Sequence, residues 1–303
     1  MTLSQAQTDT LAKLVLRYEP REAANICDWV LEFVTGKKRI DRLIDKQAVM
    51  AEDQLTRLLQ IVAELQTHRP VQYVLGEAWF AGRKFFVNEH VLIPRPETEE
   101  LVEWVVEEVL NANQRISNRR TDEQGTDERK HRIKHILDIG TGSGCIPISL
   151  AKKFPDWSFS AIDVSEAALA VARKNAADIE ADVQFQQTDF LDELQWPLLP
   201  VVDRIVSNPP YIKVAERQSM AKHVLNFEPS LALFVPDDDA LLFYRKIAEF
   251  GKTHLRAGGA VFVEINEALD KETVALFEQQ GYTVTLRKDL QGKNRMIKAI
   301  RPF

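Results

Sequence analysis

A four-residue turn, Asn208-Pro209-Pro210-Tyr211, follows a short apolar segment at residues 201–206. Proline donates no backbone hydrogen bond, so the two prolines end a strand and stiffen the turn. The Asn208 side-chain oxygen and the Pro209 carbonyl are two acceptors that together can hold an NH2 group, and the Tyr211 ring can cover a planar group. The turn predicts a site that aims a planar amide or amine at an electrophile. The alternative interpretation of this segment is a rigid surface turn without a function. The candidate catalytic residues are Asn208, Pro209 and Tyr211, and the candidate substrate-binding residues are these three with Pro210.

A glycine-rich segment joins a predicted strand, residues 135–139, to a predicted helix, residues 146–151. Glycines at such a junction allow a tight turn and a close approach of the backbone to a ligand. An isolated pattern of this kind is a weak signal, but its place between a strand and a helix strengthens it as a cofactor loop. The candidate cofactor-binding residues of this loop are Gly140, Thr141, Gly142, Ser143 and Gly144.

Further candidate cofactor residues follow the next predicted strands. Asp163 ends the second strand, where a carboxylate can accept both hydroxyls of a ribose. Asp189 and Phe190 follow the third strand and could hold an adenine by its amine and by stacking, although Phe190 alone is more typical of a core residue. The loop and Asp163 fit a nicotinamide dinucleotide as well as S-adenosylmethionine. The turn that begins at Asn208 favours S-adenosylmethionine, because a hydride-transfer enzyme has no use for it, and Asn208 is also expected at the cofactor.

Alternating strands and helices must position these residues. From residue 135 onward this alternation predicts a largely parallel sheet of the α/β class. The carboxyl ends of parallel strands meet at one edge of a sheet, so the residues that follow them are expected to lie together. A closing antiparallel pair is expected near the C-terminus. The predicted strands cover residues 135–139, 157–162, 183–186, 201–206, 260–264, 282–286 and 295–300.

The part before residue 97 has a different pattern. Residues 3–66 show helical periodicity only, which predicts a small helical bundle. Residues 79–87 and 91–93 predict a β-hairpin. Arg95 stands between two prolines and is interpreted as part of a hinge, and Thr98 is expected to cap the following helix. The expected organisation is an N-terminal helical domain over residues 1–68, a β-hairpin linker over 69–96 and a cofactor-binding domain over 97–303 with a charged insertion at 112–134.

The composition limits the classes of protein that fit. Hydrophobic residues make up 45% and charged residues 28% of the 303, as in a globular domain. A formal net charge of −6 argues against a grip on nucleic acid through phosphates, so no stable nucleic-acid binding is expected. The two cysteines, Cys27 and Cys145, lack the spacing of a metal site, and no metal is expected. The N-terminus has no signal-peptide pattern and no apolar run could span a bilayer, which predicts a cytoplasmic protein without membrane contact.

With these residues together, the sequence resembles the class I S-adenosylmethionine-dependent methyltransferases, whose sheet is Rossmann-like. It most resembles the HemK family of protein-glutamine N5-methyltransferases, and residues 94–99 resemble the members that act on peptide chain release factors. The resemblance implies that S-adenosyl-L-methionine is the methyl donor and that the substrate is the glutamine of the release factors' Gly-Gly-Gln motif. It also implies that residues 97–303 are the methyltransferase domain and that residues 1–68 dock the substrate. The matching segments are residues 69–77, 91–101, 138–144, 163, 189–190, 207–212 and 288–292.

Other functions share parts of this pattern. Methyltransferases that act on the exocyclic amines of DNA or RNA bases use a similar turn, because an NH2 group poses the same problem. The acidic net charge and the segments around residues 69–77 and 91–101 argue against them. A ribosomal-protein glutamine is another possible acceptor. A non-catalytic adaptor would be expected to lose the glycines or Asn208, and both are present. A nicotinamide-dependent oxidoreductase is the remaining alternative.

Overall fold

The computed structural model describes residues 1–119 and 134–302. They form two compact units: Met1–Glu77 with Met220–Phe227, and Ala78–Ser219 with Glu228–Phe303. The predicted linker, residues 69–96, contains the division after Glu77. Most of the predicted charged insertion falls on residues 120–133, outside the described residues. Within the described part, no helix has both the length and the apolar character that crossing a membrane would require.

The first unit consists of helices, as the periodicity predicted. α2 (Pro20–Thr35) has proline in its first turn and ends at Gly36, which adopts the left-handed φ of 66°. Apolar side chains from different helices form the core of this unit, among them Leu14, Leu31 and Leu65. The other helices are α1 (Leu3–Leu14), α3 (Arg39–Ile44), α4 (Glu52–Leu65), α5 (Val71–Leu75) and α9 (Lys222–Phe227).

The second unit is built on a seven-stranded sheet with the order β10-β11-β9-β6-β3-β4-β5. The five strands from β9 to β5 are parallel, and β11 and β10 close the sheet as an antiparallel pair. Both the parallel sheet and the closing pair confirm the sequence prediction. The strands are β3 (His135–Ile139), β4 (Ser158–Asp163), β5 (Gln184–Gln187), β6 (Val202–Ser207), β9 (Leu255–Glu264), β10 (Thr283–Lys288) and β11 (Asn294–Ile300).

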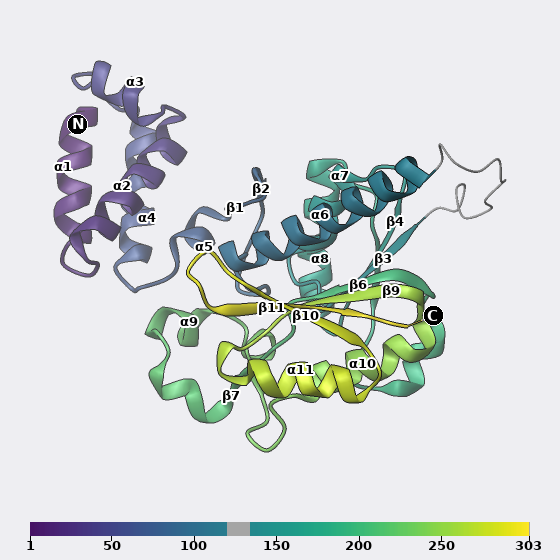
Figure 1. Ribbon diagram of the computed structural model, residues 1–303. Helices are drawn as coiled ribbons and strands as arrows, with labels where there is room; N and C mark the ends of the chain where they lie inside the picture. The colour runs from purple at the N-terminus through teal and green to yellow at the C-terminus, as the bar shows by residue number, and fades with distance from the viewer. Residues whose placement is uncertain (120–133, 303) are drawn as a thin grey trace. The chain divides into compact units, whose positions relative to one another are not determined.

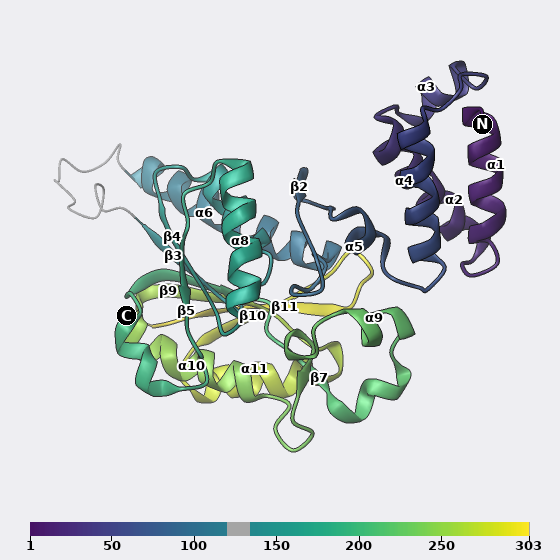
Figure 2. The ribbon, with the colours of Figure 1, turned by 180° about the vertical axis from the view of Figure 1, so that it is seen from behind.

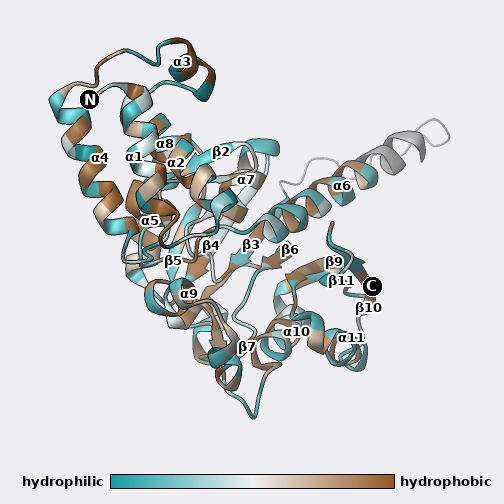
Figure 3. Ribbon diagram, turned by 90° about the vertical axis from the view of Figure 1, so that its left-hand side faces the viewer, coloured by the Kyte–Doolittle hydropathy of each residue, from teal (hydrophilic) through white to brown (hydrophobic). Residues whose placement is uncertain are grey.

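Helices cover both faces of this sheet. α6 (Pro96–Arg119), α7 (Cys145–Lys153) and α8 (Glu166–Ile179) lie on one face, and α10 (Leu242–His254) and α11 (Asp270–Gln279) on the other (Figures 1 and 2). Alternate residues of a strand point to opposite faces, so Ile136 packs under α6 and α7 while Leu137 packs under α10. This two-sided burial explains why apolar residues occupy successive positions of the central strands, as Ile136 and Leu137 do in β3. α6 carries hydrophilic and hydrophobic residues along the same length, as a helix with one buried side does (Figure 3).

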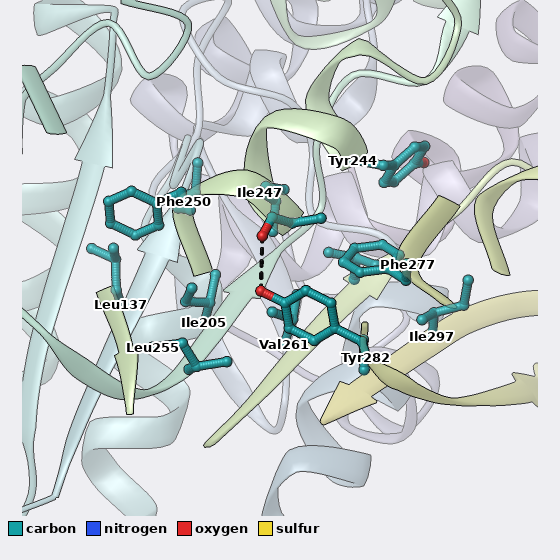
Figure 4. Packing of buried hydrophobic residues seen from close by; sticks show 14 of the residues in the cluster. Leu137, Ile205, Tyr244, Ile247, Phe250, Leu255, Val261, Phe277, Tyr282 and Ile297 are labelled. Atoms are coloured by element: carbon teal, nitrogen blue, oxygen red, sulfur yellow. Dashed lines mark hydrogen bonds between the residues drawn. The ribbon is translucent and has the colours of Figure 1, made fainter. Parts of the chain in front are cut away.

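The core under α10 and α11 contains the buried hydroxyls of Tyr244 and Tyr282. The Tyr282 hydroxyl donates a 2.8 Å hydrogen bond to the Ala248 carbonyl among aliphatic and aromatic side chains (Figure 4). Gly251 leaves room for it, because a Cβ there would stand 2.3 Å from the Tyr282 hydroxyl oxygen. The buried Tyr282 hydroxyl is therefore paired, as buried polar groups normally are.

Two local predictions are wrong. The predicted hairpin pairs residues 79–87 with residues 91–93. In the structure, β1 (Ala78–Phe80) pairs with β2 (Arg83–Phe85), and residues 91–93 form no strand. α6 begins at Pro96, so Thr98 lies inside its first turn and does not cap it. Short elements that the sequence did not indicate complete the unit: β7 (Ile212–Lys213) paired with β8 (Phe234–Val235), and the 3-10 segments η2 (Glu193–Leu198), η3 (Val214–Ser219), η4 (Ser230–Ala232) and η5 (Glu267–Leu269).

Candidate active site

A cavity of about 300 Å³ opens at the carboxyl ends of β3, β4, β5 and β6. Its walls come from the segments that follow these four strands, together with residues 90–98 and 229–232. A ligand site at this edge is what a parallel α/β sheet leads one to expect. The structure brings the following predicted site residues to the cavity wall: Gly140, Thr141, Gly142, Ser143, Asp163, Asp189, Phe190, Asn208, Pro209 and Pro210.

The loop after β3 is anchored to the end of β4. The amides of Gly140 and Thr141 both donate to the Ile162 carbonyl, at 2.9 and 3.0 Å. The Gly142 amide donates to the Asp163 carboxylate at 2.9 Å. Gly142 adopts a left-handed φ of 53°, and a Cβ placed there would meet no atom within 4 Å. The loop therefore leaves open space beside its backbone, into which a ligand can come close.

Gly144 serves a different purpose and does not line the cavity. Its φ is 78°, and a Cβ there would stand 2.9 Å from Ile148 Cδ1 and 3.1 Å from the Ala172 Cβ on α8. Gly144 thus lets α7 pack closely against α8. Of the five predicted loop residues, four face the cavity and the fifth holds the helices behind it.

Asp163 is a carboxylate held in place by backbone amides. Its two oxygens accept hydrogen bonds from the amides of Gly142 and Ser165, each at 2.9 Å. Burial raises its pKa above the usual range, and these backbone hydrogen bonds oppose that rise. The result is an oriented acceptor at the end of β4, suited to hydroxyl groups of a ligand.

Several buried polar atoms around the loop have no protein partner. Within residues 1–119 and 134–302, both carboxylate oxygens of Asp138 and the hydroxyls of Thr141 and Thr188 make no hydrogen bond. Thr141 and Thr188 line the cavity, whereas Asp138 lies in β3 and does not. Burial, with a smaller contribution from the neighbouring Asp163 carboxylate, raises the pKa of Asp138 to about 7. Buried polar groups are normally paired, so these atoms indicate a site made for a polar ligand.

Asp189 and Phe190 occupy the end of β5. Asp189 is exposed at the cavity, and its Oδ1 accepts a 3.0 Å hydrogen bond from the Leu191 amide. Phe190 is both a cavity wall and a core residue: its ring stacks on Trp196 at 5.7 Å between centroids and meets Phe250 edge-on. Its core role, which the sequence favoured for Phe190 alone, is therefore present beside its place at the cavity.

The turn after β6 is tied to its neighbours on both sides. The Ser207 hydroxyl donates to the Ile139 carbonyl at 2.7 Å, which joins the end of β6 to the end of β3. Asn208 Nδ2 donates to Thr98 Oγ1 at 3.0 Å. The turn therefore holds the Asn208 amide in one plane at the cavity wall.

Tyr211 lies behind this wall rather than on it. Its hydroxyl donates to Glu264 Oε1 at 3.1 Å, and its ring packs against the core under α10. Burial and the neighbouring Glu264 carboxylate raise the pKa of Tyr211 above its usual value. Contact between the Tyr211 ring and a planar substrate group stays a prediction.

The sequence did not indicate two parts of the site. Glu264, at the end of β9, accepts a 2.7 Å hydrogen bond from the Thr98 hydroxyl. Arg95, interpreted as part of a hinge, lines the cavity and pairs at 2.6 Å with Glu228, whose side chain is 1% exposed. A signal for Glu264 was present, because a charged residue at the end of the apolar residues 260–263 follows the same strand-end rule as Asp163.

Comparison with known proteins gives two family matches. Residues 3–76 match the model of the PrmC N-terminal domain, and residues 126–228 match that of the methyltransferase small domain. A solved structure, that of the human methyltransferase 10 domain containing protein, superposes with a TM-score of 0.50 over 73% of this chain and 89% of its own, at 17% identity. That likeness supports the methyltransferase-type fold.

Two curated relatives cover almost the whole chain. The release factor glutamine methyltransferase of Flavobacterium psychrophilum is 42% identical over 299 residues, which span 98% of this chain and 99% of the relative. The release factor glutamine methyltransferase of Bacteroides thetaiotaomicron is 40% identical over 287 residues, 94% of this chain and 95% of the relative.

Proposed function

Because the chain belongs to the release factor glutamine methyltransferase family, we propose that it methylates the side-chain amide nitrogen (N5) of the glutamine in the Gly-Gly-Gln motif of peptide chain release factors. One observation carries this proposal. The Asn208 amide is held by Thr98 at the wall of the cavity that the glycine-rich loop also lines. The methyl donor is S-adenosyl-L-methionine. When bound, it supplies a methyl group on a positively charged sulfur, which is a strong electrophile.

The residues after β3, β4 and β5 fit this donor. The open backbone at Gly142 admits a ligand, the Asp163 carboxylate would accept the ribose hydroxyls, and Asp189 would accept from the adenine amine. Phe190 would pack against the adenine from its place in the wall. The unpaired hydroxyls of Thr141 and Thr188 offer further polar contacts.

The turn after β6 would handle the substrate amide. An amide nitrogen is a poor nucleophile because its lone pair is delocalised, so alignment and exclusion of water must do most of the work. Asn208 Oδ1 and the Pro209 carbonyl would accept the two hydrogens of the glutamine NH2 group. They would aim the nitrogen and stabilise the positive charge that develops on it. Methyl transfer leaves the amide nitrogen with a positive charge and both of its hydrogens, and this cation is acidic enough to lose one proton to water, so no carboxylate base is required.

Asp163→Ala is expected to weaken the binding of S-adenosylmethionine by roughly tenfold to a hundredfold, the range that follows from losing hydrogen bonds to a charged group at about 1.5–3 kcal/mol. The change also removes the acceptor that holds the Gly142 amide. Isothermal titration of the cofactor measures the effect. Asp182→Ala, which removes an exposed carboxylate outside the cavity, is the matched control and should bind as the wild type does. Equal affinity of Asp163→Ala and the control would contradict the assignment of Asp163.

The substrate is tested by incubating the protein with methyl-labelled S-adenosylmethionine and a release factor, either wild type or with its Gly-Gly-Gln glutamine changed to alanine. Label on the wild-type factor alone is the expected result, and it would identify the substrate, the reaction and the modified residue together. Label on neither factor would reject the release factor as substrate. The search would then turn to ribosomal-protein glutamines and to the exocyclic amines of nucleic-acid bases.

A further inference from the structure

Thr98 Oγ1 lies between two groups of the second unit that are far apart in the sequence. It is 3.0 Å from Asn208 Nδ2 and 2.7 Å from Glu264 Oε2. Thr98 is 3% exposed and Glu264 is 1% exposed. The other carboxylate oxygen of Glu264 accepts from the Tyr211 hydroxyl, so both of its oxygens are engaged. A buried chain of hydrogen bonds therefore runs from β9 through the first turn of α6 to the turn after β6.

The donors and acceptors of this chain have only one consistent arrangement while Glu264 is ionised. A carboxylate can only accept, so the single hydroxyl hydrogen of Thr98 is committed to Glu264. Thr98 Oγ1 can then only accept from Asn208. The Asn208 amide must therefore turn its Nδ2 toward Thr98, and its Oδ1 is left for the cavity.

This direction matters because an Asn side chain has nearly the same shape when its oxygen and nitrogen are exchanged. If the amide were reversed, Nδ2 would face the substrate NH2 group and two donors would meet. Shape alone does not choose between the two orientations. The identity of the partner group does, and that partner is Thr98.

We propose that Glu264 and Thr98 are positioning residues that set the direction of the Asn208 amide, so that its oxygen faces the substrate nitrogen. This inference rests on the proposed function for its catalytic consequence. The direction of the amide itself is a property of the folded protein and can be measured without any substrate.

The charge state of Glu264 should control this arrangement. Burial raises the pKa of Glu264 to about 7, against the lowering effect of its hydrogen bonds. Once protonated, the Glu264 carboxyl group can donate a hydrogen bond to Thr98 Oγ1. The Thr98 hydroxyl can then donate to Asn208, with the amide reversed so that Oδ1 faces Thr98. The amide direction is therefore enforced above about pH 7 and relaxes below it. The titratable and charged groups around the Glu264 carboxylate are Glu97 on α6, Tyr211 after β6, Tyr244 on α10 and Arg295 on β11.

The catalytic consequence is tested with Thr98→Val, which keeps the shape and removes the oxygen. Turnover is expected to fall by about tenfold to a hundredfold, the cost of a misaligned reacting group, while the Kd for S-adenosylmethionine stays close to that of the wild type. Thr98→Ser, which restores the hydroxyl, should recover most of the loss. Thr273→Val removes a buried hydroxyl from α11 outside the cavity and is the matched control for stability.

The direction of the amide is read by NMR from the side-chain NH2 signals of Asn208, identified by their absence in Asn208→Asp. In the wild type the hydrogen donated to Thr98 should exchange slowly with water, and in Thr98→Val it should exchange fast. Fast exchange in the wild type, or wild-type turnover in Thr98→Val, would overturn the inference. Slow exchange in a protein that transfers no methyl group to a release factor would leave the inference intact and reject the proposed substrate.

The pH dependence gives a second test. Wild-type turnover should fall as the pH drops below about 7, whereas Glu264→Gln should be slower and nearly independent of pH across about pH 6 to 8. Burial also raises the pKa of Asp138 to about 7, so Asp138→Asn serves as the comparison and should keep the decline at low pH. A decline that persists in Glu264→Gln and disappears in Asp138→Asn would assign the titration to Asp138 and overturn the role of Glu264.

Discussion

Asn208→Ala should lower the turnover number by roughly a hundredfold or more, by analogy with the loss of one preorganised dipole from an active site. The change removes the acceptor that would aim the glutamine nitrogen and stabilise its developing charge. Steady-state transfer of labelled methyl groups to a release factor measures the effect. The Kd for S-adenosylmethionine should change much less than turnover does, because the loop after β3 and the end of β4 are untouched.

Asn111→Ala supplies the control for Asn208→Ala, since Asn111 is an exposed residue of α6 outside the cavity. Its turnover and cofactor binding should match those of the wild type. Near-normal turnover in Asn208→Ala would show that the turn after β6 does not hold the reacting amide. A large loss of cofactor affinity without a change in turnover would move Asn208 from the substrate to the cofactor.

Gly144→Ala should reduce the free energy of unfolding by about 2–5 kcal/mol. About 1–2 kcal/mol comes from the left-handed conformation that alanine disfavours, and about 1–3 kcal/mol comes from overpacking. The new Cβ would stand 2.9 Å from Ile148 Cδ1, 3.1 Å from the Ala172 Cβ and 3.4 Å from its Cα. The backbone of α8 would have to move to relieve this contact. Unfolding in urea, followed by circular dichroism, gives the change.

Gly142→Ala is the matched comparison, because it has the same conformational strain and open space around the new Cβ. Its stability should fall only by the conformational cost of about 1–2 kcal/mol. Its affinity for S-adenosylmethionine should fall as well, since the Cβ would occupy room beside the loop. Equal losses of stability in the two variants would show that the contact between α7 and α8 does not depend on Gly144.

The parts of the fold that followed from the sequence are those set by local pattern. β3, β4, β6 and β9 are largely buried, so each contains a stretch of mostly apolar residues that ends at a turn or a polar residue. The strand-end rule then placed Asp163, Asp189 and Asn208 at one edge without knowledge of the strand order. Their meeting around one cavity needed only the parallel direction of the strands.

The parts that could not be predicted depend on contacts between distant residues. Thr98 has the sequence context of a helix cap, but its hydroxyl reaches Glu264, a residue 166 positions further along the chain. Residues 91–93 have the apolar pattern of a strand, and Val91 and Ile93 are indeed buried. The Ile93 amide, however, donates to the Glu228 carboxylate, a side-chain acceptor in place of a neighbouring strand. A periodic pattern records which side chains are buried, and it does not record which partner satisfies the backbone.

The neighbouring positions of β3 and β6 have a consequence for how this enzyme can evolve. The cofactor loop leaves β3 and the Asn208 turn leaves β6, and these strands are paired in register from Ile136 with Arg204 to Asp138 with Val206. Paired strands lie about 4.8 Å apart, a spacing that backbone hydrogen bonds keep nearly constant. The starts of the loop after β3 and of the turn after β6 are thus held a nearly fixed distance apart by the sheet. The spacing of the two strands therefore leaves little room for change, and we expect a change of substrate to arise in the other segments that line the cavity, residues 90–98 and 229–232.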